Sequence, residues 1–293
     1  MPRTVAQGFH DFLAKLEPLS SEHLLVTSHY DSVRRCLNQK LRASGLVETG
    51  SFGNGTGIRH FSDTDYFSRI PGAQLKADSG LALRQVKEAL QGTFSATAGI
   101  AVRNPAVKIP FGKYAAETME ITPAKFLTVQ AFGRRSFVVY QIPDGRGGWQ
   151  LSSPEAHNYY VKSIDEQCRR RLKPLVRLIK AWNYRQRAGI SSFYLELFIT
   201  RYAHGVKTIN YPVDFARVLA LLQRKQLADL RDPMKISGLI AACPTPTKRQ
   251  QALVKVKRAA SQSKKAHAFA QANDAKKAFV EYKRLFKGAF PAF

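Results

Sequence analysis

The sequence has few cysteines, few acidic residues and no long apolar run. Its three cysteines, Cys36, Cys168 and Cys243, are far apart and odd in number. They form neither a metal-binding spacing nor a disulfide framework, so we expect reduced thiols. No apolar run reaches the roughly 18–20 residues that span a bilayer. The first residues, MPRTVAQGFHDFL, lack the apolar region of a signal peptide. These absences argue against a disulfide-rich secreted protein or a membrane-spanning one, and lead us to expect a cytoplasmic protein.

The shortage of acidic residues makes the chain strongly basic. It has 46 Lys and Arg against 21 Asp and Glu, a formal net charge of +25. Such a field attracts polyanions: nucleic acid, nucleotides or an anionic membrane surface. A solvated basic surface without a specific partner is the alternative. The same choice holds for the basic residues near the C-terminus, opposed there only by Asp274 and Glu281. These are Lys248, Arg249, Lys255, Lys257, Arg258, Lys264, Lys265, Lys276, Lys277, Lys283 and Arg284.

The pattern of apolar residues changes half-way along the chain. The composition, 44% hydrophobic over 293 residues, is globular and suffices for one large domain or two small ones. A helix is predicted over 21–44, followed by short strands around a helix at 81–90. After 144–157, which is rich in Gly, Ser and Pro, helical periodicity dominates 165–187, 191–203, 212–230 and 247–286. We predict an α+β chain, with a mixed part at 1–150 that includes the N-terminal long helix and a helical part at 151–293.

A glycine-rich stretch, TGSFGNGTGIRHFSDTDYF, runs from Thr49 to Phe67. Glycines let backbone N–H groups approach an anion, and the hydroxyl of Ser51 adds a donor. Asp63 and Asp65 lie two residues apart and face the same side of a strand. They repel unless a cation lies between them, and Mg²⁺ takes carboxylate and phosphate oxygens together. The stretch therefore predicts a nucleoside triphosphate site; a plain turn with solvated acids is the alternative.

A third carboxylate on a neighbouring strand would complete a two-metal site. The segment AETMEITPA offers Glu117 and Glu120. Strand alternation puts Glu117 with Met119 and Ile121, an apolar face typical of a core, and puts Glu120 on the other face. We therefore predict Glu120 as the ligand. An exposed strand glutamate is the alternative.

Together, these motifs resemble those of the DNA polymerase beta superfamily of nucleotidyltransferases, with Gly-Ser, then Asp-x-Asp, then a distal acid. Within it the chain is similar to the CD-NTases, the bacterial relatives of cyclic GMP-AMP synthase and 2′-5′ oligoadenylate synthetase. The segments LVRLIKAW, ISSFYLE, DPM and YKRLFKGAFP carry this second likeness. The resemblance implies a polymerase-beta-like core, a mixed sheet with flanking helices, and a C-terminal helical domain of the oligoadenylate-synthetase type around a central cleft.

The resemblance also implies roles for nine residues of this chain. Asp63, Asp65 and Glu120 would be catalytic and would bind Mg²⁺ or Mn²⁺, although the family more often has aspartate at the third position. The remaining six would bind substrate. Gly50, Ser51, Lys180 and Ser192 would hold the triphosphate, Phe193 would stack on the donor base, and Ser152 would read a base edge. The last is similar to purine-using members and favours ATP and GTP.

The implied reaction joins NTPs into a cyclic di- or trinucleotide by attack of a ribose hydroxyl on an α-phosphate, with release of pyrophosphate. The resemblance implies a monomer in bacterial anti-phage (CBASS) signalling, with a second messenger detected by a separate effector protein. Two alternatives stay open. The same site would serve an RNA-end nucleotidyltransferase, and the basic surface fits a sensor whose catalysis RNA or DNA switches.

Overall fold

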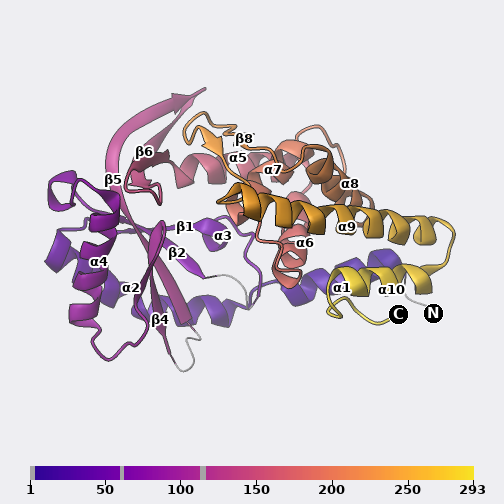
Figure 1. The fold of residues 1–293 in the computed structure, drawn as a ribbon, viewed down its shortest axis with the longest axis horizontal. Helices are drawn as coiled ribbons and strands as arrows, with labels where there is room; N and C mark the ends of the chain where they lie inside the picture. The colour runs from indigo at the N-terminus through magenta and orange to yellow at the C-terminus, as the bar shows by residue number, and fades with distance from the viewer. Residues whose placement is uncertain (1–3, 60–62, 113–116) are drawn as a thin grey trace.

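A computed structural model describes residues 4–59, 63–112 and 117–293. The α+β prediction is confirmed: a sheet lobe and a helical lobe lie side by side (Figure 1). Along the chain the order is α1 Val5–Leu16, α2 Ser20–Leu41, β1 Leu46–Thr49, α3 Gly50–Gly53, β2 Thr64–Arg69, a 3₁₀ turn Gly72–Gln74, α4 Ser79–Thr93, β3 Ala101–Arg103, β4 Ala106–Phe111, β5 Glu117–Phe132, β6 Arg135–Pro143 and β7 Trp149–Ser152. The helical lobe follows with α5 Pro154–Gln167, α6 Leu172–Arg185, α7 Ser192–Ala203, α8 Tyr211–Arg224, β8 Leu230–Arg231, β9 Leu239–Ile240, α9 Pro246–Gln271 and α10 Ala275–Leu285.

The sheet lobe is built on the long strand β5. Its seven-stranded sheet has the order β1-β2-β5-β4-β3, and β6 pairs with β5 and β7. β2 and β5 run parallel, whereas β1, β4 and β6 are antiparallel to their neighbours. One face packs on α2 and α4, in a core that includes Leu37, Val86, Met119 and Ile121. Since side chains alternate along β5, the opposite face of this strand is left for the site.

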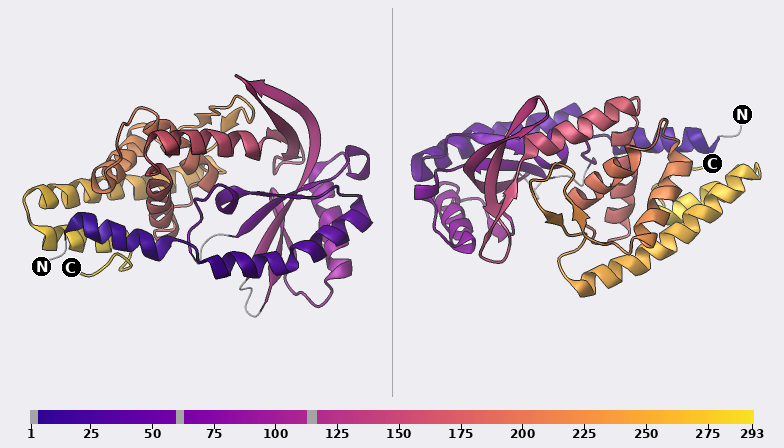
Figure 2. Two further views of the ribbon diagram at one scale, coloured as in Figure 1. Left: turned by 180° about the vertical axis from the view of Figure 1, so that it is seen from behind. Right: turned by 90° about the horizontal axis from the view of Figure 1, so that it is seen from above.

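The helical lobe has the larger core, which contains Trp182, Tyr194, Phe215 and Tyr282. Helix α1 belongs to this core although it opens the chain: the Phe9 ring lies 4.8 Å, centroid to centroid, from that of Tyr282. The left view of Figure 2 shows α1 beside α10 from behind. The predicted boundary at 150 places α1 in the sheet lobe, whereas α1 packs in the core of the helical lobe. Its stripe Val5–Phe9–Phe12–Leu16 is buried against aromatic residues from the end of the chain.

Two segments with one continuous helical pattern are each broken in the structure. The 165–187 segment bends after α5, where Arg169 and Arg170 take positive φ of 55° and 58°. Asp165 then accepts the first N–H groups of α6, from Leu172 (2.9 Å) and Lys173 (3.1 Å). The 247–286 segment breaks between α9 and α10 at Asn273, φ 58°. Periodicity alone misses both breaks because the apolar pattern continues across them.

Within the ranges described, no helix is both long and apolar enough to cross a membrane.

Candidate active site

The glycine-rich stretch forms a tight turn between β1 and β2. β1 ends at Thr49, and the single helical turn α3 follows at once. Gly50 has φ +63°, and a Cβ added to it would lie 1.9 Å from Oδ2 of Asp65. Any other residue would collide with that carboxylate, so glycine is required here by backbone conformation and by space. Residues 60–62 of the stretch lie outside the described residues.

The three predicted acids come from adjacent strands. Asp65 of β2 pairs in register with Glu120 of β5, and Asp63 comes directly before β2. Met119 and Ile121 are fully buried in the sheet core, which leaves Glu120 on the cavity face. Glu117 lies elsewhere, with its Oε2 2.9 Å from Nδ1 of His29. The side chains of β5 therefore face the sides that strand alternation predicts.

Two of the acids, Asp65 and Glu120, have raised pKa values. Burial, then the charges of Glu120 and Asp63, raises the pKa of Asp65 to about 8. Burial and Asp63 also raise the pKa of Glu120, against the opposing effect of Lys108. Lys108 on β4 pairs in register with Glu120, and its Nζ lies 3.3 Å from Oδ2 of Asp63. Lys180 likewise acts to lower the pKa of Asp65, and Arg103 that of Glu120, yet the pKa of both acids stays raised. A divalent cation between the carboxylates would relieve this repulsion.

The donor set fits a hard cation. Carboxylate oxygens are the ligands that Mg²⁺ and Mn²⁺ take together with substrate phosphates. Among the described residues, no group of three His, Cys, Asp or Glu side chains is already arranged to hold a metal ion. Repulsion between the carboxylates and the contact of Lys108 with Asp63 are consistent with ligands that converge only around a cation.

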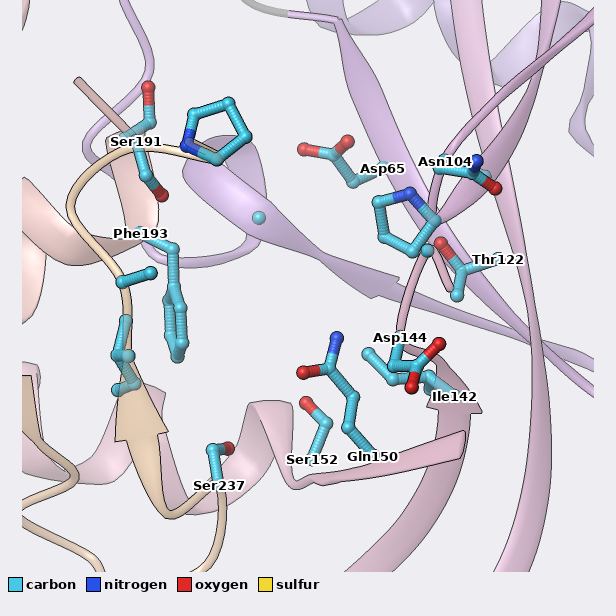
Figure 3. Close-up of a pocket in the computed structure, with 18 of the residues that line it drawn as sticks. Asp65, Asn104, Thr122, Ile142, Asp144, Gln150, Ser152, Ser191, Phe193 and Ser237 are labelled. Carbon is cyan, nitrogen blue, oxygen red and sulfur yellow. The ribbon is translucent and has the colours of Figure 1, made fainter. Parts of the chain in front are cut away.

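All nine predicted site residues line one cavity of about 1160 Å³ between the two lobes. Figure 3 shows Asp65 and Thr122 on its sheet side and Ser191 and Phe193 on its helical side. The helical wall is the start of α7, where Ser191 accepts the N–H of Tyr194 as the N-cap. The Phe193 ring, 38% exposed, is open to the cavity. Ser152, at the end of β7, lies on the same cavity.

Two of the predicted phosphate contacts are engaged with the protein itself. Lys180 is 1% exposed; its Nζ donates to the carbonyl of Thr56 at 3.2 Å and lies 3.9 Å from Oε2 of Glu196. Oγ of Ser192 lies 3.1 Å from the hydroxyl oxygen of Tyr184. A contact of either side chain with a triphosphate stays a prediction.

Several residues in or beside the cavity were not predicted from the sequence. Lys108 of β4 contacts Asp63 beside the cavity, and Asn104, in the turn between β3 and β4, lines it; neither residue was predicted. Glu196 was inside the quoted segment ISSFYLE, and Asp232 opens DPM, but neither received a role. His157 also lines the cavity and was not predicted, because its buried partner Asp232 is 75 residues away in the sequence. The quoted motifs were the available signal for two of these residues.

No family model matches the chain. In sequence it is 29% identical, over 83 residues, to a probable cyclic nucleotide synthase of Bacillus cereus (strain VD146). That match covers 28% of this chain and only 24% of the relative's length. In structure, 98% of the chain matches 99% of CdnC from E. coli MS115-1, determined with ATP, with a TM-score of 0.76 at 14% identity.

A second structural match is the CdnE cyclic dinucleotide synthase of Elizabethkingia meningoseptica, determined with GTP and Apcpp. It covers 87% of this chain and 97% of that one, with a TM-score of 0.66 at 20% identity. Likeness at such low identity bears on the fold alone. The chain has the fold of the CD-NTases.

Proposed function

We propose that this chain is a metal-dependent nucleotidyltransferase that joins NTPs into a cyclic di- or trinucleotide and releases pyrophosphate. One observation carries the proposal. Asp63, Asp65 and Glu120 line the cavity, the last two on adjacent strands, and Figure 3 shows the ring of Phe193 across the cavity from Asp65. An acid cluster suits a metal-bound triphosphate, and an open aromatic ring suits a nucleobase. The CD-NTase fold supports the same reaction.

The reaction forms one phosphorus–oxygen bond and breaks another. A ribose hydroxyl of one nucleotide attacks the α-phosphorus of a second, the bond to the β-phosphate oxygen breaks, and the hydroxyl proton passes to solvent. When bound, Mg²⁺ or Mn²⁺ would be held by Asp63, Asp65 and Glu120 and would neutralise charge on the reacting phosphate. A second transfer in the same cavity would close the ring.

The chain's own residues position the substrates. Gly50 permits close approach of the backbone at the start of α3, and Ser51 offers a hydroxyl beside it. Phe193 would stack on the donor base, while Lys180 and Ser192 would contact its phosphates. Ser152, on the β7 side of the cavity, would meet a base edge and favour ATP and GTP. Placement of both reactants between two lobes, away from bulk water, supplies much of the rate gain in such transfers.

The biological setting is part of the proposal. The structural relatives include one determined with ATP and one with GTP and Apcpp. By analogy, the product would be a second messenger of bacterial anti-phage (CBASS) defence, read by a separate effector protein. The synthase would act as a cytoplasmic monomer.

The direct test is product identification. The protein is incubated with all four NTPs and Mg²⁺ or Mn²⁺, treated with phosphatase, and the products are identified by mass. We expect a small phosphatase-resistant cyclic species. Asp63→Ala, Asp65→Ala and Glu120→Gln should abolish it, whereas the matched control Glu117→Gln should retain it. A full yield from Glu120→Gln would contradict the assignment of the acids.

One observation favours a second candidate, an RNA-end nucleotidyltransferase. The net charge of +25 exceeds what a small product needs and suits a polymer substrate. The same incubation, with labelled RNA added, separates the two candidates. A lengthened RNA without a small cyclic product would replace the first proposal with this one.

A further inference from the structure

A buried aspartate organises the loop that leaves β8. The Asp232 side chain is fully buried and accepts four hydrogen bonds. Three come from backbone N–H groups of its own loop, those of Met234 (2.9 Å), Ile236 (3.0 Å) and Ser237 (2.7 Å). The fourth partner is Nε2 of His157 on α5, at 3.0 Å. One carboxylate therefore sets the shape of residues 232–237 and ties them to α5.

The same pair contacts the open aromatic ring of the cavity through His157. Although burial raises the pKa of Asp232, the hydrogen bond and charge of His157 and the loop N–H groups lower it overall, to about 2. Asp232 is therefore a carboxylate at neutral pH, and Nε2 of His157 is the donor between them. The His157 ring meets the Phe193 ring edge-on, at 5.0 Å between centroids and 75° between planes. His157 is 4% exposed and lines the cavity next to Phe193, so its ring supports one side of the Phe193 ring.

The loop itself reaches the cavity. Ser237 lines it together with His157 and Phe193, and Figure 3 shows Ser237 on the same side as Phe193. Oγ of Ser237 is buried and has no hydrogen-bond partner among the residues described. A buried hydroxyl without a partner is unfavourable, and rotation about χ1 could bring it to a polar atom of a ligand. The loop thus offers one unused polar group beside the ring.

We propose that Asp232 and His157 are positioning residues that fix Phe193 as the stacking platform for a nucleotide base and hold loop 232–237 as the wall beside that base. This rests on the proposed function, in which Phe193 receives the base. Both residues act on the base and not on the phosphates, because their contacts lead to Phe193 and Ser237 and to none of Asp63, Asp65 and Glu120.

The test separates base binding from phosphate binding. Calorimetry with Mg²⁺ measures the affinity of the full chain for a non-hydrolysable ATP analogue and for inorganic tripolyphosphate, which has no base. Asp232→Asn and His157→Gln should each weaken the analogue about tenfold, a typical effect of lost base stacking, and leave tripolyphosphate unchanged. Because the pair acts partly through Phe193, Asp232→Asn should weaken the analogue less when it is added to Phe193→Ala than when it is made alone.

Asp214→Asn is the matched control. Asp214 is equally buried and accepts the hydroxyl of Tyr202 (2.5 Å) and the N–H of Asn210 (2.6 Å), but it does not line the cavity. We expect this variant to lose thermal stability as Asp232→Asn does and to bind both ligands normally. Equal weakening of both ligands, or unchanged binding by folded Asp232→Asn or His157→Gln, would overturn the positioning role. Failure of the wild-type chain to bind the analogue would instead overturn the proposed function.

Discussion

Asp65 destabilises the metal-free protein at neutral pH, because its neighbours and its burial disfavour the charged form. Its pKa is about 8 in the folded chain, against an ordinary value of 3.8. Between these values the folded state holds a proton that the unfolded state has released. The free energy of unfolding should therefore fall as the pH rises through this interval.

We expect Asp65→Asn to remove that dependence. With a chelator present, the melting temperature of the wild-type protein should fall from pH 5 to pH 8 more steeply than that of the variant, measured by thermal denaturation. Mg²⁺ should raise the wild-type value most at pH 8, where the carboxylate is ready to bind it, and should raise the variant's less. Parallel pH profiles for the two proteins, with and without Mg²⁺, would contradict the coupling of these acids.

At the level of elements, the turn after α3 is clamped by two helices of the other lobe. Arg177 of α6 donates to the carbonyls of Gly55 (3.0 Å) and Gly57 (3.2 Å). Glu196 of α7 accepts Nδ2 of Asn54 at 2.5 Å and also the hydroxyl of Thr56. Lys180 belongs to the same network, since its Nζ donates to the carbonyl of Thr56 and lies 3.9 Å from Oε2 of Glu196. Charged side chains of α6 and α7 therefore hold residues 54–57 against the helical lobe. These residues directly follow α3, which carries Gly50 and Ser51.

Substitution of Lys180 tests whether it serves this clamp or the substrate. Lys180→Met leaves the buried Glu196 carboxylate without its cation, so we expect a loss of about 3 kcal/mol in the free energy of unfolding, measured in urea without metal. Adding Glu196→Gln should recover part of the loss, because no uncompensated charge remains. If Lys180→Met is as stable as wild type but binds the ATP analogue poorly, the lysine is a phosphate contact alone, as the resemblance implies.

The elements also show what the sequence can predict. Alternation along β5 predicted the face of Glu120 because buried Met119 and Ile121 mark the other face. The place of α1 was not predictable, since its apolar stripe fits any apolar surface and its partners lie at the far end of the chain. The His157–Asp232 pair was likewise hidden, because a single buried hydrogen-bonded pair leaves no periodic pattern. Local periodicity reports which face is buried, and it does not report against what.

At the scale of the whole molecule, some basic side chains form ion pairs or hydrogen bonds within the protein. Lys265 and Arg284 both pair with the buried Glu281, at 3.4 Å and 3.0 Å, and Lys277 pairs with Asp274 at 2.8 Å. Nζ of Lys255 donates to the carbonyl of Arg187 at 2.5 Å. Other basic residues of α9 and α10 are exposed and have no ion pair within the described part of the chain. They include Lys248 at the start of α9, and also Lys257, Arg258, Lys264 and Lys276. We call the latter four the α9–α10 basic surface.

If the α9–α10 basic surface binds a regulatory RNA or DNA, its affinity must fall steeply with salt. Each phosphate neutralised contributes a slope of about −0.9 in log affinity against log salt for duplex, or about −0.7 for single strands. Reversal of all four residues to Glu should reduce this slope and abolish any change in product yield that nucleic acid causes, measured by binding titrations and product assays at several salt concentrations. Synthesis without nucleic acid should continue, because none of the four lines the cavity.

Reversal of Lys265 and Lys277, already paired, is the control and should change the slope less. Affinity that ignores salt, or synthesis that no nucleic acid alters, would leave this surface with only the steering of NTP toward the cavity.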